Sequence, residues 1–305
     1  MEDLILLAAR NAPLKSVGKL ELQTGDKVRL AVQQLLLVKD TLCYLSIWIP
    51  KGDLGEAVQA LTILLPRLSN LTHIELLHGH ISVCNSQPQF YQGIFPLLLQ
   101  LPLLQHLSIG EIKIQRGNYD FTALFVDYLE QQQTLTSLRL NHVAFTHSER
   151  LFELLLQSPQ CTISHLDTPH LDHTRITKRL SKLSHYCLSD FNGYENVDHL
   201  ELTVPVPKKE RSPDRWNLVC DIIASCPSIQ QLTITMTASS LPLRFLNALN
   251  WNYTLRRFYL KNESVSDHID LSQLNLVIQA HPTIENKQMK DYLIQNGKHR
   301  VHLDV

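Results

Sequence analysis

Histidines that stand two residues before an acid or a serine are the feature of this sequence most able to do chemistry. Four such pairs stand inside a recurring apolar pattern, three ending in an acid and one in a serine: His73 with Glu75, His106 with Ser108, His165 with Asp167, and His199 with Glu201. Residues two apart in an extended chain point to the same side. Each pair therefore presents an imidazole and an oxygen group on one surface.

A zinc site is the first chemistry that these side chains suggest, because imidazoles and carboxylates on strands about 4.8 Å apart can converge on one ion. The sequence lacks the close ligand spacing that makes such an assignment specific. The six cysteines form no Cys-x-x-Cys pair and are scattered as Cys43, Cys84, Cys161, Cys187, Cys220 and Cys226. We therefore expect no metal and no cofactor, and we expect reduced thiols packed as small apolar residues.

A nucleophilic site can be assembled from Ser108, His106 on the same strand and Glu75 on the neighbouring one. A serine nucleophile needs a tight turn next to an oxyanion hole, which a flat strand does not supply. The sequence also contains no Gly-rich phosphate loop. We expect a protein that is not an enzyme, and the alternative is a metal-dependent or histidine-based enzyme that uses the same row of histidines and acids.

Each of the four histidines is the third residue of a hexad with the pattern Leu-x-x-Leu-x-Leu, in which Val, Ile or Phe can replace Leu. Nine hexads occur at steps of 25 to 34 residues, and one of them has Thr168 as its last anchor. Their first anchors are Val17, Leu42, Leu71, Leu104, Leu135, Ile163, Val197, Ile229 and Leu255. A repeat at this period predicts an array of similar units rather than separate globular domains.

Helical patterns separate the hexads, with apolar residues three and four apart. Examples are Ala57-Leu61-Leu64-Leu65, Phe121-Leu124-Phe125-Leu129, Leu151-Leu154-Leu155 and the segment from Leu271 to Ala280. Strand, turn and helix therefore alternate along the chain, which predicts an α/β fold with a parallel sheet.

The hexads and the helices between them resemble the leucine-rich repeats of the longer type seen in ribonuclease inhibitor. The resemblance implies a horseshoe-shaped solenoid with parallel strands on the concave face and helices on the convex face. We predict one domain over residues 1–305, with an N-terminal cap at 1–16, about nine repeats at 17–265 and a C-terminal cap and tail at 266–305.

The sequence departs from the repeat pattern of that family at two kinds of position. The family has Asn or Cys at the ninth position of each repeat, where this chain has Pro50, Gly79, Ile112, Val143, Leu171, Pro205 and Glu263. The usual asparagine ladder is therefore missing, and we expect irregular curvature. Because Thr168 stands at an anchor position, we also expect its strand to end after Leu166.

The third and fifth residues of the hexads form two rows on the predicted concave face. The residues that we predict to bind a partner are Tyr44, Trp48, His73, Glu75, His106, Arg139, His165, Asp167, His199, Glu201, Arg257 and Tyr259. Tyr, Trp and Arg dominate many interfaces, which makes them the expected anchors. Trp48 has an alternative role, because it follows its hexad and can pack beneath the turn.

We expect a non-enzymatic module that binds a partner protein through the concave face. The formal charge of −1 and the isoelectric point near 6.9 make a nucleic-acid partner unfavourable, although Lys208, Lys209 and Arg211 form a small basic group. No apolar run is long enough to span a membrane. We expect a monomer in a reducing compartment.

The irregular steps and the polar surface, rich in His, Gln and Asn, resemble stand-alone repeat effectors that intracellular bacteria deliver into host cells. That resemblance implies a host protein as partner and secretion into the host cytoplasm. A cytoplasmic eukaryotic adaptor has the same sequence features and is the alternative source.

Overall fold

The computed structural model describes residues 16–21, 26–49, 54–78, 87–110, 121–141, 143, 148–168, 175–186, 194–204, 215–226, 228–236, 241–262, 272–285, 293–295 and 298–300. The chain forms two compact units, unit 1 at residues 1–163 and unit 2 at residues 164–305. Each unit is described by itself. The single domain over residues 1–305 stays a prediction, and most of the predicted N-terminal cap lies outside the described residues.

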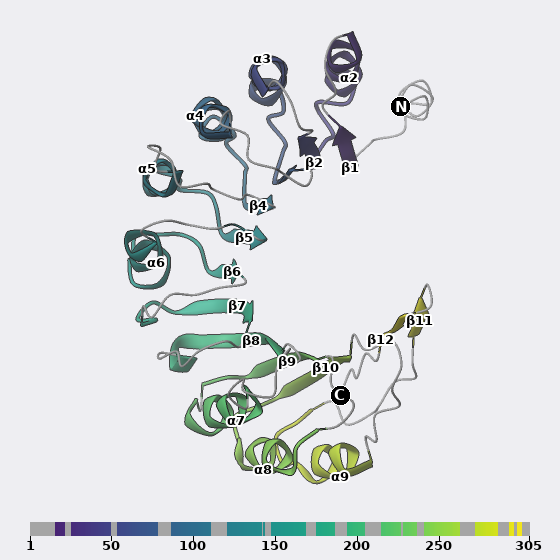
Figure 1. Cartoon of the computed structure of the whole chain (residues 1–305), viewed down its shortest axis with the longest axis vertical. Helices are drawn as coiled ribbons and strands as arrows, with labels where there is room; N and C mark the ends of the chain where they lie inside the picture. The colour runs from purple at the N-terminus through teal and green to yellow at the C-terminus, as the bar shows by residue number, and fades with distance from the viewer. Residues whose placement is uncertain are drawn as a thin grey trace. The chain divides into compact units, whose positions relative to one another are not determined.

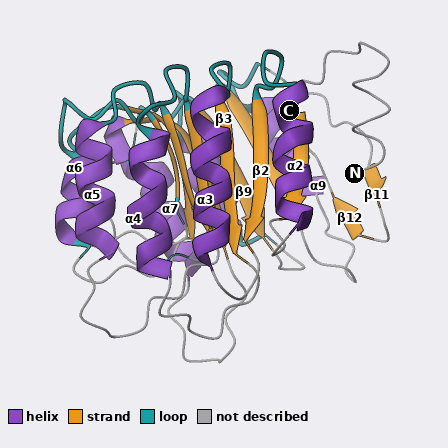
Figure 2. Ribbon diagram, turned by 90° about the horizontal axis from the view of Figure 1, so that it is seen from above, coloured by secondary structure: helices purple, strands orange, loops and turns teal. Residues whose placement is uncertain are grey.

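Unit 1 alternates strands and helices, as the hexads and helical patterns predict. Its strands β1 to β5 pair in sequence order, and every pair is parallel. Helices α2 to α6 stand side by side along one face of these strands (Figures 1 and 2). The elements are β1 (Ser16–Glu21), α2 (Asp26–Leu37), β2 (Tyr44–Ile49), α3 (Leu54–Leu64), the 3-10 turn η1 (Leu65–Arg67), β3 (His73–His78), α4 (Gln87–Leu98), β4 (His106–Gly110), α5 (Phe121–Gln131), β5 (Ser137–Asn141) and α6 (Glu149–Leu156).

Unit 2 also has parallel strands, β6 to β10, which pair in sequence order. Its elements are β6 (His165–Asp167), β7 (Leu180–Tyr186), the 3-10 turn η2 (Tyr194–Asn196), β8 (Val197–Val204), α7 (Arg215–Ser225), β9 (Gln231–Met236), α8 (Leu243–Trp251), β10 (Arg257–Asn262), α9 (Ser272–Ala280) and a small antiparallel hairpin of β11 (Leu293–Gln295) and β12 (Lys298–Arg300). The predicted α/β class with a parallel sheet is confirmed.

The hexad anchors form the core between the strands and the helices. From Leu42 onward every anchor is buried, and the first and middle anchors of each hexad are no more than 2% exposed. Behind β4 and β5 the helices add an aromatic cluster, in which Phe95 stacks on Tyr128 at 4.7 Å and Phe121 stacks on Phe125 at 5.8 Å between ring centroids. Burial of these apolar side chains is the main favourable contribution to folding.

Strand β7 corrects the predicted repeat boundaries. The step of 34 residues from Ile163 to Val197 contains a further hexad, whose first two anchors, Leu180 and Leu183, are fully buried. Its third anchor is His185, a polar residue that does not fit the hexad pattern of Leu, Val, Ile or Phe. The described residues between Ser164 and Val204 contain three strands and one 3-10 turn but no α-helix, so strand and helix do not alternate here as predicted.

His185 is accommodated in the core by a polar partner. Its Nε2 lies 2.8 Å from the hydroxyl oxygen of Tyr194, and the two rings are stacked with an interplanar angle of 13°. Thr168 occupies the equivalent anchor of the previous strand, is 2% exposed, and donates its backbone N–H to Ser184 O at 2.9 Å. The prediction that this strand ends after Leu166 is therefore wrong. Asp167 pairs with Ser184 of β7, and Thr168 is hydrogen-bonded to the same residue.

Strand β1 also departs from the predicted phase. The hexads place Leu20 opposite Leu45, whereas the structure pairs Val17 with Leu45 and Leu20 with Ile47. Between these two pairs β1 advances by three residues and β2 by two. The extra residue on β1 is the signature of a β-bulge. The third and fifth residues of this hexad are Lys19 and Glu21, and the places that the hexad pattern gives them in the two predicted rows are therefore wrong.

Hydroxyl side chains that follow the helices bond one repeat to the next. Four threonines donate a hydrogen bond from Oγ1 to the carbonyl of the first anchor of the preceding repeat: Thr134 to Leu104 at 2.7 Å, Thr162 to Leu135 at 2.6 Å, Thr254 to Ile229 at 3.5 Å and Thr283 to Leu255 at 2.7 Å. These bonds satisfy main-chain carbonyls before the strands, while the ladder expected in the resembled family lies after them.

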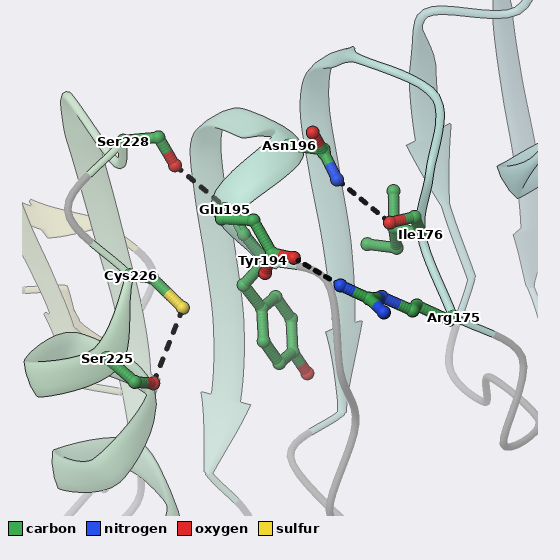
Figure 3. A network of polar contacts seen from close by, with 8 residues as sticks. All are labelled: Arg175, Ile176, Tyr194, Glu195, Asn196, Ser225, Cys226 and Ser228. Carbon is green, nitrogen blue, oxygen red and sulfur yellow. Dashed lines mark hydrogen bonds and ion pairs between the residues drawn. The ribbon is translucent and has the colours of Figure 1, made fainter.

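Asparagine and serine take the same place around β8 and β9 (Figure 3). Asn196 Nδ2 donates to Ile176 O at 2.9 Å, and Ser228 Oγ donates to Tyr194 O at 3.5 Å. The row of small polar residues before the strands is therefore a general feature of the repeats in both units.

Asn252 is the most highly connected residue of this kind, and it ends helix α8. It is 7% exposed, donates from Nδ2 to Ile223 O at 2.9 Å, and accepts from the backbone N–H groups of Thr254 at 3.2 Å and Leu255 at 3.1 Å. One side chain thus joins two consecutive repeats.

We predict that Asn252→Leu lowers the free energy of unfolding by about 2–4 kcal/mol, because it removes the partner of buried main-chain donors and of a buried carbonyl. Urea denaturation followed by circular dichroism measures the change. Asn250→Leu is the matched control, since Asn250 is exposed on α8. Equal effects of the two substitutions would contradict the assigned role.

A second prediction concerns the polar pair in the core of unit 2. His185→Leu and Tyr194→Phe each remove one partner of a buried hydrogen bond and should each destabilise by about 1–3 kcal/mol. The double variant should cost less than the sum by about 1 kcal/mol, because it leaves neither partner of that bond behind. Thermal and urea unfolding of the four proteins measures this coupling, and strictly additive changes would argue against it.

Candidate functional site

The side of the unit 1 strands opposite the buried anchors carries three rows of residues in register, which we call the unit 1 polar face. The parallel pairing aligns equivalent residues of β2 to β5 side by side. The rows are Tyr44, His73, His106 and Ser137; Ser46, Glu75, Ser108 and Arg139; and Trp48, Leu77, Gly110 and Asn141. All six partner-binding residues predicted in unit 1 lie on this face.

His73 and His106 form a stacked pair on the polar face. Their ring centroids are 3.8 Å apart and the rings are within 10° of parallel. His73 Nδ1 also lies 2.7 Å from the hydroxyl of Thr72. Burial lowers the pKa of His73, because the charged imidazolium is poorly solvated there. The neutral form of His73 is therefore favoured in the folded protein.

Tyr44, Glu75 and Arg139 form a second group on the same face. Burial raises the pKa of Tyr44, and the hydrogen bond that its hydroxyl donates to Glu75, together with the negative charge of Glu75, raises it further. A hydrogen bond with Ser46 and the positive charge of Arg139 act in the opposite direction. Arg139 itself is exposed. This group offers a partner one charge of each sign close to an aromatic ring.

Trp48 lies on the polar face and not beneath the turn. It shares the side of β2 with Tyr44 and Ser46, is half-buried, and pairs in register with Leu77. Gly110 follows in the same row, where an added Cβ would lie 3.0 Å from Leu77 Cδ2. The lack of a side chain at Gly110 therefore leaves room for the apolar group of Trp48 and Leu77.

The unit 2 polar face is built in the same way, but the order of the residues along it differs from the order that the hexads predict. Its two rows are His165, Lys182, His199, Gln231 and Arg257, and Asp167, Ser184, Glu201, Thr233 and Tyr259. The hexads that begin at Ile163 and Val197 are consecutive in the sequence, so they predict that His165 and His199 lie on neighbouring strands. This prediction is wrong, because Lys182 of the unrecognised strand β7 lies between them. The apolar hexad pattern does not find Lys182 and Ser184, because the third anchor of their hexad is the polar residue His185.

Lys182 changes the electrostatics of this face. Its Nζ lies 2.9 Å from Glu201 Oε2, and the Glu201 side chain is only 16% exposed. His199 Nε2 lies 3.1 Å from Thr233 Oγ1. Glu201 and His199 are thus held by protein partners, while His165 and Arg257 are exposed and Tyr259 is half-exposed.

The side chains that the sequence raised as a metal site or a nucleophilic site can be located in the part of the chain that the structure describes. Among the described residues, no group of three or more His, Cys, Asp or Glu side chains is placed to hold a metal ion. Ser108 is 7% exposed and lies next to Glu75 in register, while the imidazole of His106 is stacked on His73.

No protein-family model matches the chain, and no curated protein has significant sequence similarity to it. In the part of the chain that the structure describes, no helix has both the length and the apolar character needed to cross a membrane.

We predict that the stacked pair makes unit 1 sensitive to acid. Since burial lowers the pKa of His73, its contribution to stability is complete above its ordinary pKa of about 6.5 and is lost as the pH falls below that value. His106→Ala opens one face of the His73 ring to water and should raise the pKa of His73 toward 6.5. Titration of the ring protons by NMR measures it.

Ser137→Ala is the control for this titration, because Ser137 is the next residue in the row beyond His106. It should leave the pKa of His73 unchanged. An unchanged pKa in His106→Ala would show that stacking does not cause the burial of the imidazole.

Proposed function

We propose that the chain is a leucine-rich repeat protein that binds a partner protein through its polar faces and has no catalytic activity. The parallel strands with in-register rows, the buried hexad anchors and the helices on the opposite side of the strands support this proposal. Its location in a host cell or in the cytoplasm of its own cell stays a prediction.

The observation that carries the proposal is the composition of the unit 1 polar face. The rings of Tyr44, His73 and His106 lie in one row. The acidic Glu75 and the basic Arg139 lie in the row beside it. Rigid rings supply contact area at low entropic cost, and the flanking charges select a complementary partner. Such a surface is suited to a protein or peptide, because a small metabolite needs an enclosed and largely apolar site.

The unit 2 polar face supports the same function with different chemistry. Glu201 is already paired with Lys182, so its charge is neutralised within the protein. Arg257 and Tyr259 stand two residues apart on β10 in different rows, and Arg257 is exposed, as is His165 on β6. We therefore assign binding in unit 2 chiefly to Arg257, Tyr259 and His165, and less to His199 and Glu201, which have partners within the protein.

The proposal predicts that Tyr44→Ala, Glu75→Lys and Tyr259→Ala each reduce capture of the partner by roughly tenfold or more, with circular dichroism unchanged. The purified chain is used as bait in cell lysate, and captured proteins are quantified by mass spectrometry.

Glu153→Lys is the matched control for the charge reversal, because Glu153 is exposed on helix α6. It should leave capture unchanged. If the three polar-face variants captured the same proteins as the unmodified chain, or if Glu153→Lys alone lost them, the binding surface would lie on the helices or loops.

A further inference from the structure

A polar depression lies in unit 2 at the residues that precede the strands, away from the rows of the polar face. Its volume is about 560 Å³. The lining residues come from the segments before β7, β9 and β10 and from the segment after α9: Arg179, Ser228, Gln230, Tyr253, Thr254, Arg256, Thr283 and Glu285. Four segments of unit 2 therefore contribute to one hollow.

Arg256 is the more available of the two arginines. Its guanidinium contacts Glu285 through a single pair of atoms, Nη1 and Oε1, at 3.4 Å, and its side chain is 63% exposed. A guanidinium has five N–H donors, so one long contact uses little of its capacity. Glu285 is held nearby in any case, because its backbone N–H donates to Arg256 O at 3.0 Å.

Arg179 shows which ligand the site is able to hold. Its Nη2 donates to Asp198 Oδ1 at 2.7 Å and its Nε donates toward Oδ2 at 3.4 Å, so a carboxylate lies across the fork of the guanidinium. The Arg179 side chain is 75% exposed. The contacts with Asp198 use Nε and Nη2, so the N–H groups on the other edge of the exposed guanidinium can meet an incoming carboxylate.

The rest of the lining suits a peptide. Gln230 is exposed and offers an amide, and Tyr253 is 56% exposed and offers an aromatic face. The hydroxyls of Thr254 and Thr283 donate to main-chain carbonyls, so they serve the repeat structure and not a ligand. A wide and polar hollow lacks the enclosure that a small metabolite needs.

We propose that this depression binds an acidic peptide segment of a partner protein, whose carboxylates engage the open edge of Arg179 and replace Glu285 at Arg256. Glu285 then acts as an internal competitor for Arg256. This inference is independent of the polar faces, because it concerns other residues and another side of the strands.

The test measures binding of a fluorescein-labelled glutamate-rich peptide to the full-length chain by fluorescence anisotropy, with a glutamine-rich peptide of the same length beside it. The glutamate peptide should bind and the glutamine peptide should not. Arg179→Gln and Arg256→Gln should each weaken binding about five- to tenfold. Glu285→Gln should strengthen it about two- to fivefold, because it removes the internal competitor.

Arg244→Gln is the matched control. Arg244 is also exposed and also paired with a carboxylate, that of Asp221 at 2.7 Å, but it does not line the depression. It should bind the peptide as the unmodified chain does. The gain in Glu285→Gln guards against misfolding, because an unfolded variant would not bind more tightly.

Three results would overturn the proposal. They are an absence of binding by the glutamate peptide, an equal loss in Arg244→Gln and Arg256→Gln, and binding of a phosphoserine peptide without binding of the glutamate peptide. The last result would assign the depression to phosphate in place of carboxylate.

Discussion

Parallel pairing in register is the constraint on which each unit depends. Because equivalent residues of consecutive strands pair with one another, a residue type that recurs at one hexad position becomes a continuous row. Leucine rows on one side form the core, and polar rows on the other side form the candidate binding faces. The same constraint brings two histidines from different repeats, His73 and His106, into a stack.

The main-chain groups between the strands must be satisfied for this pairing to persist. The chain lacks asparagine at the position where the resembled family has it, and small polar residues before the strands bond the carbonyls of the preceding repeat. Thr134 and Thr162 do so with their hydroxyls, and Asn252 does so with its amide. A buried carbonyl without a partner is costly, which explains why these residues recur at one position.

Two polar side chains are buried in the core of unit 2 at positions where the hexad pattern has apolar anchors. Thr168 and His185 replace apolar anchors on adjacent strands, and Tyr194 supplies a hydroxyl to the imidazole. Where a hydrogen-bonding partner is available, a buried polar anchor is retained without loss of the strand. The unrecognised strand then places Lys182 beside Glu201 and changes which charges the unit 2 polar face presents.

The sequence by itself determined the fold class, the anchors from Leu42 onward and the face on which Tyr44, Glu75 and Arg139 lie, because the alternation of a strand and the spacing of a helix are local properties. Only the tertiary structure decided the bulge in β1, the existence of β7 and the position of Trp48. It also decided the depression around Arg179 and Arg256, since that hollow combines segments more than 70 residues apart. These features depend on hydrogen bonds and packing between repeats, which no local pattern records.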